Sequence, residues 1–174
     1  MTVFEKVDLA IKALQNAEEK TSFAPPASRE ELARLNALLA EAKLPELPVD
    51  FMYLLSRCGS CEGRYFNIYG TQGLQGAAKP DDVLMIDYSI DINREEDDDD
   101  PKGLYLGDIP GLMPYGIHYK LVYKNGLYYH LEDDRGVLSY FNGPDNIGDF
   151  IMKEIKTAEA GRRRAEVEKH EKES

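Results

Sequence analysis

Between Tyr115 and Phe141 the sequence alternates between apolar and polar residues, and this alternation constrains the fold more than any other feature. Successive side chains of a strand lie on opposite faces, so a period of two predicts strands with one buried face. We therefore expect an antiparallel meander that ends with a strand over 137–141. The apolar odd-numbered positions are Tyr115, Ile117, Tyr119, Leu121 and Tyr123, and His118, Lys120 and Lys124 are the polar residues that alternate with them.

The first hairpin of this meander contains Asn125-Gly126, a pair typical of a two-residue type I′ turn. That turn would pair Tyr123 with Tyr128 and would move the later odd-numbered apolar residues to the polar face. A three-residue loop, 124–126, pairs Tyr123 with Leu127 and keeps the odd-numbered residues on one face. The alternation therefore predicts the three-residue loop, with its glycine as the left-handed residue of a G1 bulge.

In that register His118 faces Glu132 and Lys120 faces His130, so two histidines and a carboxylate share the outer face of the hairpin. His118, His130 and Glu132 are the ligand types of a two-histidine, one-carboxylate metal site. An open hairpin face supplies no second layer of residues to orient such ligands. We expect a surface cross-strand pair and no cofactor, and a metal-dependent enzyme that uses these three residues is kept as an alternative.

Helices are expected where apolar residues recur three and four positions apart. The first covers 3–20, and the prolines of TSFAPPAS end it. The second begins at Ser28, which forms a capping box with Glu31. The third starts at Pro48 and ends near Cys58. A helix is also favoured over a strand at 81–93.

The last helix is expected to be capped by Asp145 and to bury Ile147, Phe150, Ile151 and Ile155. Beyond Gly161 the apolar stripe is lost. The sequence RRRAEVEKHEKES is therefore expected to form a frayed helix or a tail.

The two cysteines of the chain, Cys58 and Cys61, form a C-x-x-C pair. In thiol oxidoreductases such a pair lies at a helix N-terminus, where the helix dipole lowers the pKa of the first thiol. Here it follows the end of the 48–58 helix, where the dipole raises the pKa. A structural zinc ion needs about four ligands, and no second pair of cysteines exists. We expect packing residues rather than a redox or metal centre.

Six consecutive acidic residues cannot pack together and must be solvated. They are Glu95, Glu96, Asp97, Asp98, Asp99 and Asp100. The alternating acids and the central glycine of a calcium loop are missing, which disfavours calcium. The segment is either a charged loop without a specific role or a docking patch for a basic protein partner.

The formal net charge of −11 repels nucleic acid and anionic membranes, and it steers basic proteins toward the chain. No apolar run approaches the roughly 18 residues of a membrane span, and the N-terminus has no secretory signal. We expect a cytoplasmic chain whose partner is a protein; its oligomeric state is left open. Because GxSxG is absent and the three histidines lie on strands or in the tail, we do not expect an enzyme.

Two motifs carry a family resemblance: LPVDFMYLLSRCG at 47–59 and IGDFI at 147–151. With an aromatic strand and an antiparallel meander between them, they resemble the SUKH superfamily, named in part for yeast cell-wall synthesis regulators. The resemblance covers roughly 28–156. It divides the chain into an N-terminal helix and proline-containing linker (1–27), a SUKH-like domain (28–156), and a C-terminal helix extension or tail (157–174).

This resemblance implies an α+β domain with an antiparallel-rich twisted sheet flanked by helices. Many bacterial members of the superfamily resemble immunity proteins that bind and neutralise cognate toxins, and no catalytic motif is shared. It therefore implies a non-catalytic protein-binding domain, first of all an immunity protein against a basic toxin. A regulatory scaffold related to the cell-wall (glucan) synthesis regulators is the alternative.

Overall fold

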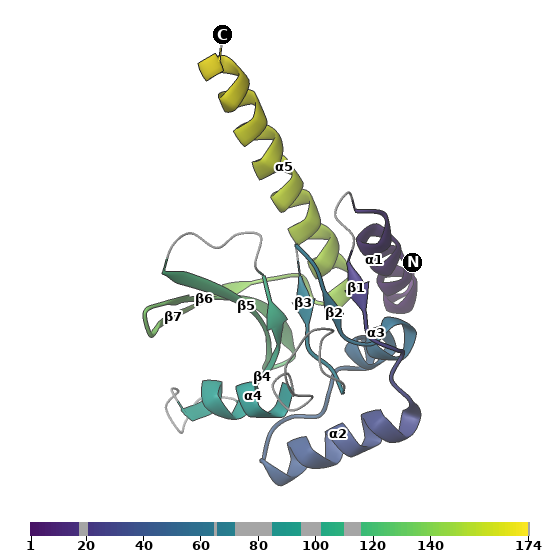
Figure 1. Ribbon diagram of the computed structural model, residues 1–174. Helices are drawn as coiled ribbons and strands as arrows, with labels where there is room; N and C mark the ends of the chain where they lie inside the picture. The colour runs from purple at the N-terminus through teal and green to yellow at the C-terminus, as the bar shows by residue number, and fades with distance from the viewer. Residues whose placement is uncertain (18–20, 65, 72–84, 95–101, 110–115, 174) are drawn as a thin grey trace.

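The computed structural model describes residues 1–17, 21–64, 66–71, 85–94, 102–109 and 116–173, which form an α+β fold (Figure 1). The described strands make one antiparallel sheet in the order β1-β2-β3-β4-β5-β6-β7. The helices are α1 (Val3–Asn16), α2 (Arg29–Glu41), α3 (Val49–Cys58), α4 (Met85–Arg94) and α5 (Ile147–Glu173). The strands are β1 (Ser22–Phe23), β2 (Cys61–Glu62), β3 (Asn67–Ile68), β4 (Gly103–Asp108), β5 (Ile117–Lys124), β6 (Leu127–Asp134) and β7 (Val137–Asn142).

The hairpin between β5 and β6 has a two-residue turn, so the predicted three-residue loop is wrong. Tyr123 lies opposite Tyr128. Asn125 and Gly126 both have positive φ, 51° and 79°, as a type I′ turn requires. Asparagine and glycine are the residues that adopt this conformation at least cost.

The prediction failed because both faces of these strands are buried, not one. Leu121 and Tyr128 are buried on one face of the sheet, while Val122 and Leu131 are buried on the other. When both faces carry apolar residues, the parity of those residues no longer fixes the register.

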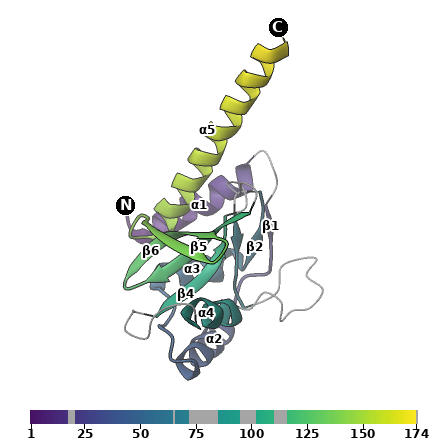
Figure 2. The ribbon, with the colours of Figure 1, turned by 90° about the vertical axis from the view of Figure 1, so that its left-hand side faces the viewer.

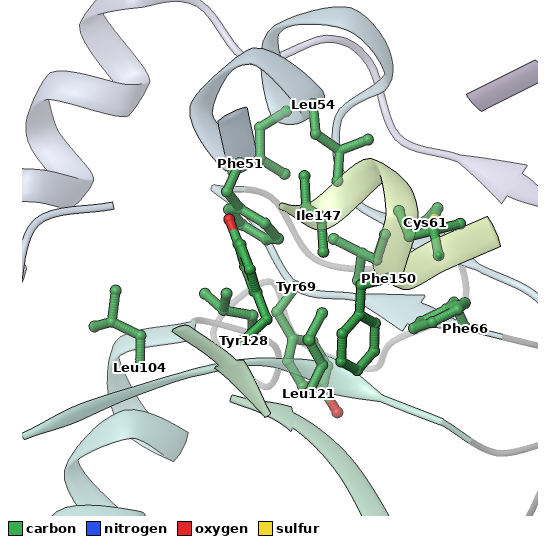
Figure 3. Close-up of a cluster of buried hydrophobic side chains, with 14 of the residues drawn as sticks. Phe51, Leu54, Cys61, Phe66, Tyr69, Leu104, Leu121, Tyr128, Ile147 and Phe150 are labelled. Atoms are coloured by element: carbon green, nitrogen blue, oxygen red, sulfur yellow. The ribbon is translucent and has the colours of Figure 1, made fainter. Parts of the chain in front are cut away.

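The core lies between the sheet and the helices α3 and α5 (Figure 3). Tyr128 of β6 reaches across to this layer, where its ring lies 6.4 Å from that of Phe150 in α5. Phe66 packs against the other side of Phe150, at 6.2 Å between ring centroids. These aromatic contacts fix the first turns of α5 over β6.

The helix α4 confirms the prediction of a helix over the described part of 81–93. It covers the part of the β4 edge that β3 does not pair with. Asn93 donates to the carbonyl of Gly103 at 2.9 Å and accepts from its N–H at 3.0 Å. The Ser89 hydroxyl accepts from the Tyr105 N–H at 2.8 Å. Side chains of α4 thus satisfy backbone groups that a neighbouring strand would otherwise bind.

The described residues of 1–27, a segment that the family resemblance leaves outside 28–156, contribute to the same hydrophobic core. The buried face of α1 includes Val7 and Leu14, and β1 pairs with β2. At Gly148 the backbones of α1 and α5 meet: a Cβ there would lie 2.6 Å from the Lys6 carbonyl carbon. The closing IGDFI motif therefore contains the glycine that allows these two helices to cross.

The C-terminal part of α5 projects away from the body of the molecule (Figures 1 and 2). The region 157–173, in which a helix extension or a tail was expected, is helical throughout, including the part after Gly161 that was expected to be a frayed helix or a tail. The last buried residue of α5 is Ile155. Pairs four residues apart, such as Arg162 and Glu166 at 3.9 Å, support the projecting turns.

Candidate functional site

The sequence-predicted docking segment, Glu95–Asp100, lies outside the described residues, so the geometry says nothing of it. The second predicted group is His118, His130 and Glu132. The observed register places His118 opposite Asp133, and Glu132 opposite Tyr119. His130 lies opposite Leu121, on the same face as Glu132, while His118 lies on the other face.

The three residues therefore cannot bind one metal ion, and the expected pairing of His118 with Glu132 is wrong. The error follows from the one-residue difference in the hairpin loop, because such a slip turns every side chain to the other face. Within the described part of the chain, no group of three His, Cys, Asp or Glu side chains is placed to hold a metal ion.

His130 instead contacts an acid that the sequence did not single out, Glu154 of α5. The His130 Nδ1 atom lies 3.3 Å from Glu154 Oε1, and the two side chains are only 19% and 8% exposed. Which atom donates depends on the histidine tautomer. The sequence held a signal for Glu154, because it interrupts the apolar stripe formed by Phe150, Ile151 and Ile155.

These two residues line a pocket of about 220 Å³ between the β6–β7 strands and α5. Its other walls come from the end of β7, the turn that follows it, and one face of α5. The lining residues are His130, Phe141, Asn142, Gly143, Pro144, Phe150, Lys153, Glu154 and Thr157.

A buried carboxylate on α3 fixes the geometry around this pocket. Asp50 is 8% exposed. Its Oδ1 accepts from the Tyr128 hydroxyl at 2.7 Å, and its Oδ2 accepts from the Ile147 N–H at 2.8 Å. Burial, and then the negative charge of Asp50, raise the pKa of Tyr128, which keeps the phenol protonated as the donor. The acid of the LPVDF motif thus joins α3, β6 and the start of α5.

The cap of α5 is Asn146, which corrects the expectation of Asp145. Its side-chain oxygen accepts from the Asp149 N–H at 2.8 Å. Its amide nitrogen donates to the Asp149 carboxylate at the same distance. Lys6 also binds that carboxylate, at 2.7 Å, and mainly this hydrogen bond lowers the pKa of Asp149.

Beside the pocket, β7 is the last strand of the described sheet, and it exposes large apolar side chains. Val137 and Phe141 are 68% and 53% exposed. Both lie on the face that carries His130: Phe141 is opposite His130 in the register, and their rings lie 6.5 Å apart. Exposed apolar residues on an edge strand are a common feature of protein-binding surfaces.

A second polar cluster lies on the opposite face. Asp108 accepts hydrogen bonds from the hydroxyls of Tyr69 and Tyr105, whose rings are stacked at 5.5 Å. Burial, followed by the charge of Asp108, raises the pKa of Tyr105. Lys120 Nζ lies 4.9 Å from the centroid of the Tyr105 ring. Both tyrosines are buried, so this cluster ties β3, β4 and β5 together rather than forming an open site.

Both cysteines are free and buried, as expected for packing residues. Cys58 is the last residue of α3, and Gly59 ends the helix with φ of 64°. Burial raises the pKa of each thiol to about 12. A thiol of such high pKa is a poor nucleophile at neutral pH.

None of the described helices is both long and apolar enough to cross a membrane. No protein-family model, curated protein or solved structure matches the chain. The fold and the surface together define an α+β domain with a seven-stranded antiparallel sheet in its described part, an exposed apolar edge strand, and a small acid-containing pocket beside it.

Proposed function

We propose that the protein is a non-catalytic binding domain of the cytoplasm that neutralises a basic protein toxin by docking through β7. The observation that carries this proposal is the pair of exposed apolar residues, Val137 and Phe141, on the terminal strand of the sheet. A strand at an edge can accept a strand or loop of a partner, while side chains beside it supply contact area.

The charge of the chain agrees with a basic partner. A net charge of −11 accelerates association with a cationic protein, and this acceleration falls as salt screens the charges. The resemblance to the SUKH superfamily points to the same role, since many of its bacterial members resemble immunity proteins. Glu95–Asp100 belongs to the proposal as a further docking patch.

The test uses the full chain as bait in a lysate of its host, with elution by a salt gradient and mass spectrometry. A variant with Val137→Lys and Phe141→Lys changes the edge strand. A second variant with Leu9→Lys and Val167→Lys changes net charge equally at exposed apolar positions on α1 and α5. A basic protein should be retained by the wild type and by the second variant, and lost from the first.

Expression of that captured protein in a test strain then separates the two functions. Toxicity that is relieved by the wild type, but not by the edge-strand variant, is the expected result. A captured protein that is harmless to cells would support the regulatory scaffold instead. Equal retention by both variants would contradict docking through β7.

A further inference from the structure

The pocket between β7 and α5 contains a buried carboxylate oxygen without a hydrogen-bond partner. Among the described residues, no donor reaches Glu154 Oε2, although this atom is excluded from solvent. Oε1 is already engaged by His130 at 3.3 Å. Buried carboxylate oxygens are normally hydrogen-bonded, because an unsatisfied one has lost its contacts with water without gaining others. The site therefore lacks a donor.

The size and the walls of the pocket restrict what that donor can be. A volume of about 220 Å³ is below the 300–1,000 Å³ typical of pockets for drug-sized ligands, so it suits a single side chain. Phe141 and Phe150 supply aromatic walls, and Pro144 adds apolar surface. An acid enclosed by aromatic walls favours a cation with a long apolar stem.

Arginine fits this combination better than lysine. A guanidinium group is planar, so it stacks on an exposed aromatic ring such as Phe141 while its N–H groups point at a carboxylate. The terminal bond of a glutamate side chain rotates over a broad, two-fold range. Because this range is broad, a partial rotation can turn Oε2 from its buried position toward an incoming donor while Oε1 stays near His130. Lys153 also lines the pocket, but it is exposed, and its flexible stem lets its ammonium group remain in water.

We propose that this pocket binds the guanidinium group of an arginine side chain presented by the protein partner. The proposal rests on the proposed function for the source of the arginine, and it extends the docking surface from β7 onto α5. It assigns Glu154 the role of charge partner, Phe141 that of stacking platform, and His130 that of a residue that positions the carboxylate.

The pocket can be tested without the partner. The full-length protein, labelled with ¹⁵N, is titrated with N-acetyl-arginine methylamide and followed by NMR. We expect binding in the millimolar range, as for a single side chain. Shifts should be concentrated at the backbone amides of His130, Phe141 and Glu154. The citrulline derivative, which has the same shape but no charge, should bind at least about tenfold more weakly.

Two variants identify the carboxylate. Glu154→Gln keeps the shape of the side chain and should weaken arginine binding at least about tenfold. Glu168→Gln, on the exposed projecting part of the same helix, removes the same charge and should have no effect. If Glu154→Gln does not fold, Phe141→Ala serves instead, because Phe141 is half-exposed and its loss should still reduce affinity for arginine.

Equal binding of the arginine and citrulline derivatives, or affinity unchanged in Glu154→Gln, would overturn the proposal. Free arginine that binds more tightly than the blocked amide would overturn the assignment to a partner's side chain. Because these measurements use no partner, the pocket can fail while docking through β7 stands. Conversely, arginine can bind in the pocket even if no toxin is ever captured.

Discussion

Replacing Asp50 should destabilise the fold more than any other single change to a polar side chain discussed above. Asp50 is buried, and its two oxygens accept from the Tyr128 hydroxyl and from the first N–H of α5, at Ile147. Oδ1 also accepts from the buried Phe51 N–H, at 3.0 Å. Asp50→Ala therefore leaves all three donors without this acceptor. Tyr128→Phe removes one donor and leaves the carboxylate bound to Ile147.

The expected magnitudes follow from counting the groups left without a partner. Each buried donor without an acceptor costs about 1–3 kcal/mol. Asp50→Ala should therefore lower the free energy of unfolding by about 3–5 kcal/mol, and Tyr128→Phe should lower it by about 1–2 kcal/mol. The double variant, Asp50→Ala with Tyr128→Phe, has no tyrosine hydroxyl left to be unsatisfied. The decrease in its free energy of unfolding should therefore be smaller than the sum of the two single decreases, by about 1–2 kcal/mol.

Urea denaturation followed by far-ultraviolet circular dichroism measures these differences, provided that the denaturant dependence m stays constant across the variants. Asp134→Ala is the matched control: this aspartate lies on β6 and is half exposed, so its loss should change stability by less than about 0.5 kcal/mol. An Asp50→Ala protein within about 1 kcal/mol of wild type would refute the reasoning. Strictly additive losses in the double variant would also refute it.

Two further predictions concern α5 and the cysteines. Gly148→Ala should destabilise the protein by about 1–3 kcal/mol, because the new Cβ meets the backbone of α1. At Gly161 a new Cβ meets nothing within 4 Å, so Gly161→Ala should raise the helix content. Thermal unfolding and circular dichroism distinguish the two, and equal effects would contradict the close helix crossing. With pKa values of about 12, Cys58 and Cys61 should resist Ellman's reagent at pH 7.5 in the native state and react fully in denaturant. Rapid reaction of the native protein would show that the thiols are not buried.

Most features governed by residues close in sequence were predicted well, although the cap of α5 lies one residue later than expected, at Asn146. Ser28 and Glu31 form both hydrogen bonds of the capping box. The helix α3 ends at Cys58, near which the sequence placed its end, and Gly59 caps it. These structures depend on contacts within a turn or two of helix, and their residue preferences are strong.

Among the features governed by distant residues, the α+β class and the antiparallel meander were predicted, but the register of the first hairpin and the contact of His130 were not. The hairpin register failed because α3 and α5 bury one face of β5 and β6, while Val122 and Leu131 are buried on the other. The alternation of apolar and polar residues alone does not show that both faces of these strands are buried. The pairing of His130 with Glu154 joins a strand to a helix 24 residues later, and only the interrupted apolar stripe of α5 hinted at it.

The motif that carries the family resemblance and the pocket that carries the proposed binding are physically connected. Tyr128 and His130 are two residues apart on β6, so their side chains lie on the same face. Ile147 and Glu154 are seven residues apart on α5, about 10 Å along the helix axis and on nearly the same side. Asp50 binds the first member of each pair.

One buried carboxylate therefore sets the position of α5 over β6, and with it the distance between His130 and Glu154. Asp50 makes none of the hydrogen bonds described above with His130 or Glu154. A variant of Asp50 that remains folded should consequently weaken arginine binding as well as stability, whereas Glu154→Gln should weaken arginine binding alone. Such a pattern would mean that the LPVDF motif, structural in itself, places the residues through which the domain recognises its partner.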